Sequence, residues 1–158
     1  MLNIYNVGPL FTEAEVKQRR YEGARIRSLL EANNVAYTLA NPIDMPTSNK
    51  TNVTASEIAS ADYERLNNAD VVFFDLSNED SGSCVALGIM MEKYKQGKNL
   101  ELYPIFFDIR LSRNGQSGLE SSCGFNSMVV GILKSSNIEI YNSFEEALEA
   151  FKTNHQYI

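Results

Sequence analysis

The polar residues of this chain that could do chemistry gather at the ends of its apolar runs. Asp80 opens the sequence Asp-Ser-Gly-Ser shortly after an apolar run that ends at Asp75. A carboxylate there can accept two directed hydrogen bonds, so it suits a hydroxylated or protonatable ligand at the mouth of a crevice. Asp80 equally suits a helix N-cap, since Asp and Ser accept hydrogen bonds from the free amides of a first turn. The residues alone leave both interpretations open.

Other arrangements typical of catalysis or cofactor binding are missing from the sequence. Gly115-Gln116-Ser117-Gly118 is not a GxSxG elbow, and neither GxGxxG nor GxxxxGK[ST] occurs. Cys84 and Cys123 have neither a CxxC spacing nor a histidine cluster beside them, so we expect no metal site and no disulfide framework. The single histidine, His155, lies in the C-terminal tail, where an exposed side chain is the simpler interpretation.

Short apolar runs alternate with helical patterns along the chain, which is typical of βαβ units and a parallel sheet. Three helices begin with a capping-box spacing, at Thr12, Thr54 and Ser143. The predicted strands are Leu2 to Val7, Val35 to Leu39, Val71 to Asp75, Leu102 to Phe107 and Ile138 to Tyr141. The predicted helices are about Glu13 to Ala32, Thr54 to Asn68, Ser83 to Gln96, Phe125 to Ser135 and Ser143 to Lys152.

These elements predict one α/β domain over residues 1–158, a flavodoxin-like, doubly wound parallel sheet of five strands with helices on both faces. The continuous apolar run Val71 to Asp75 is of the kind buried on both faces, so we expect it at the centre of the sheet. In such a sheet the ligand crevice lies outside the carboxyl ends of the strands. Residues 108–124 are rich in glycine and serine, and we expect them to form a mobile loop that could close over this crevice.

Composition limits the partners. The chain has 158 residues, with 14 Lys and Arg against 20 Asp and Glu, and a formal net charge of -6 at pH 7. That charge repels a phosphate backbone, so we expect no nucleic-acid partner. The N-terminus lacks the basic start and apolar run of a secretory signal, and no stretch approaches the roughly 18 apolar residues of a membrane span. We therefore expect a cytoplasmic protein with no membrane partner.

Three blocks of sequence resemble the nucleoside 2-deoxyribosyltransferases. They are Ile4 to Thr12 (IYNVGPLFT), Ala61 to Asp70 (ADYERLNNAD) and Asp80 to Gly88 (DSGSCVALG). The blocks occur in the family's order, and each lies at a strand end or in the adjoining helix. The resemblance covers most of the chain and implies the same doubly wound fold.

The resemblance implies a reaction of nucleoside salvage, in which a 2-deoxyribosyl group passes between nucleobases by double displacement through a covalent glycosyl enzyme. Its ligands are nucleosides and free nucleobases, and we expect no cofactor and no metal. A glutamate is the family's nucleophile, which suits an oxocarbenium-like transition state because an anion stabilises the developing charge before bonding to it. The position six residues after the family aspartate holds Ala86 here. Alanine cannot attack a sugar, so we expect this chain to be inactive or crippled as a transferase.

Two explanations for Ala86 stay open. Either the nucleophile was replaced by engineering, so that an intact nucleoside is held without turnover, or a natural relative has lost or relocated the activity. The otherwise intact site favours the first explanation. Alanine is also a good helix former, which explains why a helix tolerates it but does not explain its neighbours.

The resemblance also assigns roles to other residues. It implies that Asp80 binds the nucleobase and relays a proton to the departing base, and that Asp62 is the second aspartate of the base site. From the residues alone, Asp62 is equally a solvated surface charge. Tyr5 matches the tyrosine that orients the nucleophilic carboxylate. Gly8 and Phe11 match positions near the ligand, where Gly8 would allow close backbone approach and Phe11 would offer an apolar wall.

Asn126 resembles the asparagine that reaches a neighbouring subunit's site to hold the sugar 5′-hydroxyl. The resemblance therefore implies a homo-oligomer that is at least a dimer. Family members often assemble as hexamers built as trimers of dimers.

Three other functions stay open. A 2′-deoxynucleoside 5′-monophosphate N-glycosidase of the same superfamily would need a phosphate site. Ser81-Gly82-Ser83 at a helix N-terminus could hold an anion, but Glu79 and Asp80 beside it argue against this. A non-catalytic nucleoside-binding module is supported by Ala86 alone. An electron-transfer protein with bound flavin mononucleotide is suggested only by the architecture, which is a weak basis for function.

Overall fold

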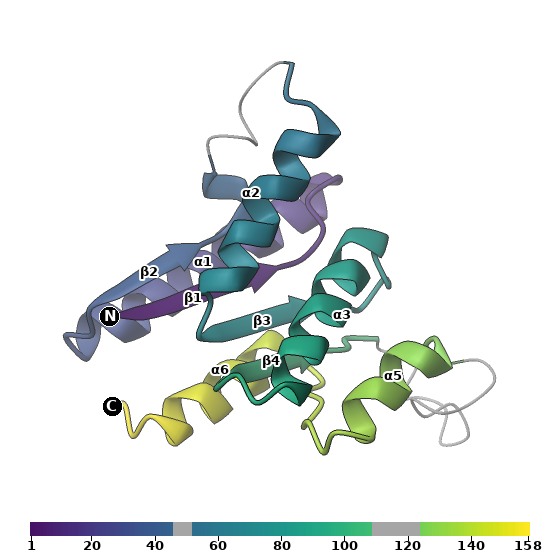
Figure 1. The fold of residues 1–158 in the computed structure, drawn as a ribbon. Helices are drawn as coiled ribbons and strands as arrows, with labels where there is room; N and C mark the ends of the chain where they lie inside the picture. Colours follow the sequence, from purple (N-terminus) through teal and green to yellow (C-terminus); the bar gives the residue numbers. More distant parts are fainter. Residues whose placement is uncertain (46–51, 109–123) are drawn as a thin grey trace.

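The computed structural model describes residues 1–45, 52–108 and 124–158 (Figure 1). Its sheet has four parallel strands in the order β2-β1-β3-β4, and helices cover both faces. The strands are β1 (Leu2–Val7), β2 (Tyr37–Ala40), β3 (Val71–Asp75) and β4 (Glu101–Ile105). The helices are α1 (Glu13–Ala32), the short 3-10 helix η1 (Pro42–Asp44), α2 (Ala55–Asn68), α3 (Ser81–Lys95), α5 (Ser127–Lys134) and α6 (Phe144–Asn154).

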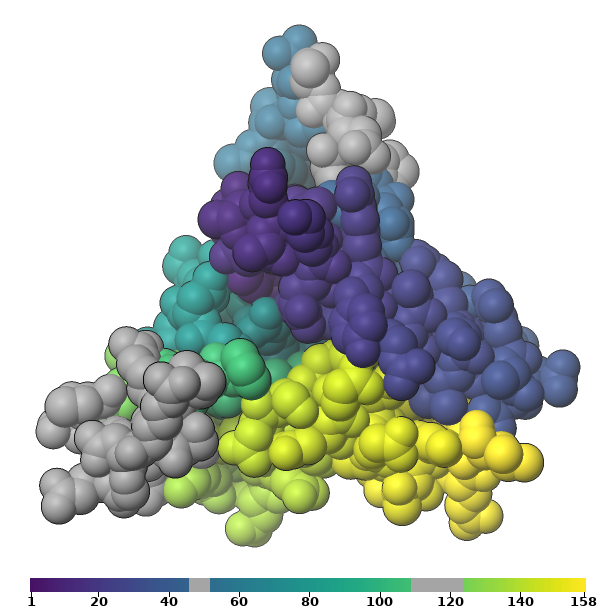
Figure 2. All heavy atoms as spheres, turned by 180° about the vertical axis from the view of Figure 1, so that it is seen from behind, coloured from purple at the N-terminus to yellow at the C-terminus, as the bar shows by residue number. Residues whose placement is uncertain are grey.

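The two faces of the sheet have separate hydrophobic cores. Along β3, Val72 and Phe74 pack into the core under α2, α3 and α5, whereas Val71 and Phe73 pack into the core under α1 and α6. All four side chains are fully buried. This double burial confirms the doubly wound α/β fold with β3 inside the sheet, as the continuous apolar run predicts. Figure 2 shows the second face, where the yellow C-terminal segment lies beside the purple and blue N-terminal part of the chain.

The predicted fifth strand, Ile138 to Tyr141, is wrong. In the described residues this segment makes only one parallel bridge, between Ile105 and Tyr141. Extending that ladder towards Glu139 would need an amide hydrogen at Pro104, which proline lacks. In the other direction the chain turns at once into α6, whose N-cap is Ser143. The sheet therefore has four strands rather than five.

The second strand begins later than predicted, because α1 ends in a turn that uses Val35. Asn34 adopts a left-handed backbone with φ of 55°, and the amide of Val35 donates to the carbonyl of Leu30 at 3.0 Å. Strand pairing starts only at Tyr37, which lies opposite Leu2. At the end of α3, Gly97 has φ of 86°, as expected for a glycine that ends a helix.

The loop expected over residues 108–124 lies almost entirely outside the described residues, as does Cys123. Among the residues that the structure describes, no helix is long and apolar enough to cross a membrane.

Candidate active site between α2 and α3

Tyr5, near the carboxyl end of β1, holds a carboxylate from α2. Its hydroxyl donates a 2.9 Å hydrogen bond to Oδ1 of Asp62, and the Tyr5 side chain is buried at 5% exposure. Burial, and then the charge of Asp62, raise the pKa of the Tyr5 phenol well above its ordinary value. Tyr5 therefore stays protonated and acts as a hydrogen-bond donor to the carboxylate.

Arg65, one helical turn after Asp62, completes this arrangement. Its Nη1 lies 2.9 Å from the same Oδ1 of Asp62, so the oxygen that Tyr5 binds also pairs with a guanidinium. Both residues are on α2, where a spacing of three places them on one face. Sequence reasoning did not single out Arg65, although its position three residues after Asp62 was the available signal.

Ala86 lies on α3 and packs into the same core as Tyr5. Its side chain is 8% exposed, at the border between the core and the surface. The structure therefore brings the position expected for the nucleophile to the side of the sheet that carries Tyr5 and Asp62. We call the region formed by Tyr5, Asp62, Asp80 and Ala86 the α2–α3 site.

Asp80 is the N-cap of α3, as the helix-cap interpretation predicts. Its Oδ2 accepts hydrogen bonds from the backbone nitrogen of Ser83 at 2.8 Å and from the Ser83 hydroxyl at 2.9 Å. Because the cap lies at Asp80, α3 begins two residues earlier than the expected start at Ser83. One oxygen of Asp80 thus supports the helix, and the side chain remains partly exposed at its N-terminus.

The turn before Asp80 connects the site to α5. Glu79 has a left-handed backbone with φ of 52°, and its side chain accepts a hydrogen bond from the backbone nitrogen of Asn126. Asn126 is the N-cap of α5, and its Oδ1 accepts from the amides of Met128 and Val129 at 2.9 and 3.4 Å. Within one chain, Asn126 therefore has a structural task that the resemblance did not indicate.

Gly8 follows β1 and faces a buried arginine. A Cβ on Gly8 would overlap the guanidinium of Arg19, and it would lie 3.1 Å from Cβ of Asp75. Close approach at Gly8 is thus required by the protein's own side chain, whatever ligand binds nearby. Phe11, in the same connection, is 79% exposed and leaves its ring open to solvent.

Arg19 of α1 contacts the carboxyl ends of β1 and β3. Its guanidinium pairs with Glu22 at 2.9 Å and with Asp75 at 2.5 Å, and it donates to the carbonyl of Val7 at 3.4 Å. Burial raises the pKa of Glu22 above its ordinary value, while the charge of Arg19 opposes that change. Sequence reasoning missed this network, although Arg19 falls on the same helix face as Gly23 and Ile26 and is completely buried.

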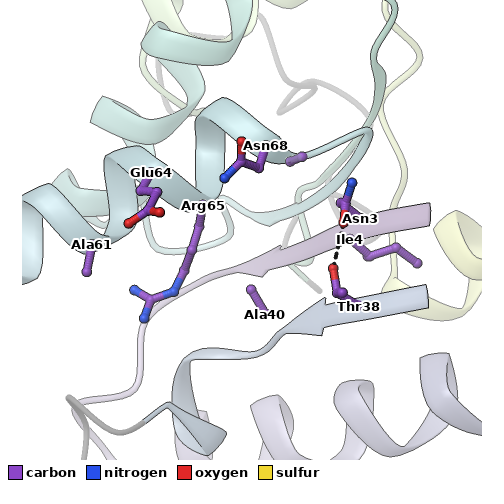
Figure 3. A pocket seen from close by; sticks show the side chains of 9 residues that line it. Asn3, Ile4, Thr38, Ala40, Ala61, Glu64, Arg65 and Asn68 are labelled. Atoms are coloured by element: carbon purple, nitrogen blue, oxygen red, sulfur yellow. Dashed lines mark hydrogen bonds between the residues drawn. The ribbon is translucent and has the colours of Figure 1, made fainter. Parts of the chain in front are cut away.

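A pocket of about 410 Å³ lies between α2 and the face of β1 and β2 (Figure 3). Arg65 extends from α2 towards the strands, and the Thr38 hydroxyl of β2 donates a 2.9 Å hydrogen bond to Oδ1 of Asn3 on β1, so that two of the lining residues are joined. Arg65 thus contacts Asp62 and also lines this pocket. A second pocket of about 410 Å³ lies between α1 and α6, on the other face, and includes Asp75 at the carboxyl end of β3.

The fold is a doubly wound sheet, and its candidate site has a tyrosine near the end of β1 and aspartates on α2 and at the start of α3. These features are typical of small α/β proteins that bind polar ligands outside the carboxyl ends of the strands. The family described as nucleoside 2-deoxyribosyltransferase matches residues 4–116. The chain belongs to this family. It is therefore a member of a transferase family, and the predicted resemblance is confirmed.

Several proteins are similar to this chain. The uncharacterized protein UU063 of Ureaplasma parvum is 28% identical over 121 residues, which are 72% of this chain and 75% of that protein. A conserved protein from Enterococcus faecalis has a crystal structure with a TM-score of 0.72 at 24% identity, covering 98% of this chain and 99% of that one. The 2-desoxiribosyltransferase from Leishmania mexicana has a TM-score of 0.63 at 20% identity, with the same coverage. Both solved structures share the fold.

Proposed function

We propose that this chain binds a 2′-deoxynucleoside at the α2–α3 site, and that its transfer of the 2-deoxyribosyl group is crippled by Ala86. The observation that carries this proposal is the contact between Tyr5 and Asp62, on the same side of the sheet as Ala86. The site keeps a hydroxyl donor, Tyr5, and a carboxylate, Asp62. Ala86, the α3 residue that packs into the same core as Tyr5, carries only a methyl group. Family membership supports the reaction class.

In the proposed reaction, Asp62 and Asp80 bind the base, and Asp80 supplies the proton that makes the departing base a neutral leaving group. In the family's reaction, the nucleophile is the ionised carboxylate of a glutamate at the position of Ala86. That carboxylate would stabilise the oxocarbenium-like transition state and then bond to the anomeric carbon. A second base would then attack the anomeric carbon. Each displacement inverts the configuration at that carbon, so the two together retain it. With alanine at position 86, binding and positioning remain while this nucleophile is lost.

The first experiment compares this chain with Ala86→Glu. Each protein is incubated with a deoxynucleoside and a different free base, and the products are separated by chromatography. We expect Ala86→Glu to form the exchanged nucleoside at least on the order of 10³-fold faster, because a removed nucleophile typically costs this much or more. Ala86→Gln is the matched control, since it has the size of glutamate without the nucleophilic oxygen pair.

Each other outcome of this experiment selects a different function. Free base and free sugar without exchange would identify a hydrolase. Binding of nucleoside by all three proteins without any turnover would identify a binding module and contradict the transferase proposal. Absence of nucleoside binding in all three proteins would overturn the proposed function.

The alternative of a 5′-monophosphate N-glycosidase has one structural argument against it. A phosphate at the start of α3 would need the free amides of its first turn. The carboxylate of Asp80 already accepts from the amide and hydroxyl of Ser83, and it would repel a phosphate. The expected result is no release of base from a deoxynucleoside monophosphate in the same assay.

We also propose that the working unit is a homo-oligomer, at least a dimer and in the family's manner a hexamer built as a trimer of dimers. The exposed side chains of Val85 and Met128, at 64% and 74%, support a partner over α3 and α5. In such an assembly Asn126, at the start of α5, would lie near the neighbouring site.

A further inference from the structure

We propose that the pocket between α1 and α6 binds a small organic ammonium ion with an aromatic or alkyl body. We call this cavity the α1–α6 pocket. It lies on the face of the sheet opposite to Tyr5 and Ala86, so it is a second ligand site beyond the proposed function. Its volume of about 410 Å³ is within the range of small-molecule sites.

The α1–α6 pocket lies outside the carboxyl ends of β3 and β4. Asp75 ends β3 and Ile105 ends β4, and both residues line the pocket together with the first turns of α1 and the start of α6. On the face shown in Figure 2, the purple start of α1 lies above the yellow α6. Ligands of doubly wound sheets bind at this end of the strands, so the position of the pocket suits a ligand.

Aromatic and aliphatic side chains form the apolar part of the lining. Phe144 and Ile105 are buried, whereas Tyr21 and Phe107 are 48% and 62% exposed. The rings of Tyr21 and Phe144 meet edge to face, with their centroids 6.3 Å apart. Aromatic rings that stay open to solvent beside a cavity offer apolar contact to the body of a ligand, and their faces attract a cation.

The charged side chains of the lining are all acidic. They are the four carboxylates of Glu15, Glu22, Asp75 and Glu145. Two guanidiniums pair with these carboxylates from outside the lining, Arg19 with two of them and Arg25 with the third. Four negative charges against two positive ones leave a formal charge of -2 around the pocket, which favours a cationic ligand.

An anion is disfavoured at the pocket, although two helices begin there. Free amides at a helix start attract anions. Here the carboxylate of Glu15 accepts from the backbone nitrogens of Phe11 and Thr12 at 2.9 and 2.8 Å. The hydroxyl of Ser143 accepts from the backbone nitrogen of Glu146 at 3.2 Å. The pocket therefore offers carboxylates to a ligand rather than free amides.

The arrangement of the carboxylates suits an organic cation better than a metal ion. In the described part of the chain, no three acidic, histidine or cysteine side chains are grouped as metal ligands. The acidic side chains are instead spread along a cavity that also has aromatic walls. Such a cavity can take the charge of an ammonium group and the apolar body attached to it.

Glu145 is the carboxylate that we expect to contact the ammonium group. Its side chain is partly exposed, and its oxygens accept from the hydroxyl of Tyr21 at 2.6 Å and from Arg25 at 3.3 Å. Each carboxylate oxygen can accept a second hydrogen bond. Because Tyr21 holds Glu145 through its own hydroxyl, a carboxylate and an aromatic ring lie next to each other at the pocket.

Isothermal titration calorimetry with two small probes tests this assignment. One probe is 2-phenylethylamine, which is an ammonium ion at pH 7, and the other is 2-phenylethanol, which has the same body without the charge. We expect the amine to bind at least roughly 10-fold more tightly than the alcohol, because only the amine has a charge to pair with the carboxylates. Equal affinity for the two probes, or no binding of the amine up to about 10 mM, would overturn the inference.

Two variants on α6 provide the matched comparison. Glu145→Gln removes one charge of the pocket and keeps the shape, so it should weaken amine binding about 3- to 10-fold. Glu149→Gln makes the same change of charge one turn further along the helix, on an exposed side chain outside the pocket, and should leave amine binding unchanged. Equal weakening by the two variants would mean general attraction to an acidic protein and would contradict a site here.

Phe107→Ala examines the aromatic wall. Because the ring is exposed, its loss should leave the melting temperature nearly unchanged while amine binding weakens at least about 3-fold. If neither Phe107→Ala nor Glu145→Gln changed the affinity, the amine would bind outside the α1–α6 pocket and the inference would be wrong.

A competition experiment distinguishes this site from the proposed nucleoside site. Amine binding is measured with and without a saturating 2′-deoxynucleoside, and we expect the same affinity in both cases because the two sites lie on opposite faces of the sheet. Displacement of the amine by the nucleoside would contradict a second site. Absence of nucleoside binding would count against the proposed function alone.

Discussion

The guanidinium of Arg19 occupies the space beside Gly8 where any other residue would place its Cβ. The same guanidinium pairs with Glu22 and Asp75, so a side chain at position 8 would displace a buried charge from two buried or partly buried partners. Such charges are costly to leave unpaired. At the residue scale, the glycine in the sequence block IYNVGPLFT is therefore needed to leave room for the ion pairs of Arg19, whether or not a substrate binds nearby.

We predict that Gly8→Ala destabilises the protein by roughly 2–4 kcal/mol, because Arg19 must move or the end of β1 must shift. Urea denaturation followed by circular dichroism measures this change. Gly88→Ala is the control, since a Cβ there meets no atom within 4 Å, and alanine should stabilise α3 by up to about 1 kcal/mol. Equal stability of the two variants would show that the guanidinium is free to relocate.

At the scale of elements, the starts of α3 and α5 explain how site residues can have two tasks. Asp80 and Asn126 both cap helices through side-chain oxygens. Glu79, in a left-handed conformation, connects these two helix starts through its bond to the backbone of Asn126. The site is therefore positioned by the same hydrogen bonds that begin its helices.

We predict that Asn126→Ala lowers the free energy of unfolding by about 1 kcal/mol, because the amides of Met128 and Val129 lose their acceptor. Thermal unfolding of the isolated protein measures this loss. Asn126→Ser should keep most of the stability, since serine is also a good N-cap. An unchanged melting temperature in Asn126→Ala would mean that the cap contributes nothing and that the residue serves contacts outside its own chain.

At the scale of the whole molecule, a buried polar network joins the first helix to three strand ends. Asn6 donates to Glu22 at 2.8 Å and to Asn41 at 3.2 Å, and Arg19 continues the chain of contacts to Asp75. The network lies at the carboxyl ends of β1, β2 and β3. It sets the relative positions of the strands that carry the site, because buried polar groups that bond to one another favour a single arrangement.

The network should give the protein a characteristic pH dependence. Burial raises the pKa of Glu22, so as the pH rises, the unfolded chain ionises before the folded one does. The contribution of Glu22 to stability is therefore largest below its unfolded pKa of about 4.3 and falls as the pH rises through the folded pKa. We predict that the stability of the parent chain relative to Glu22→Gln decreases as the pH rises above the unfolded pKa of about 4.3, as measured by urea unfolding at a series of pH values. An increase instead would mean that pairing with Arg19 outweighs burial.

Much of the fold and part of the site follow from local sequence. The capping boxes at Thr12 and Thr54 predict where α1 and α2 begin, because a cap depends only on residues within one turn. The unbroken run Val71–Asp75 predicts a central strand, because only a strand buried on both faces is apolar at almost every position. The prediction of a fifth strand failed because a ladder needs a donor on its partner, and Pro104 stands on a different strand.

The sequence by itself determined the order of helices and strands and the helix cap at Asp80, because these depend on nearby residues. It also determined that position 86 lacks a nucleophile, because that depends only on the residue type. The tertiary structure decided which carboxylate Tyr5 holds, since Asp62 is 57 residues away and only the packing of α2 on β1 brings them together. It also decided that the guanidinium of Arg19 lies against Gly8, because α1 and the end of β1 come into contact only when the helix packs on the assembled sheet. Contacts between distant segments depend on the whole fold, which no local pattern contains.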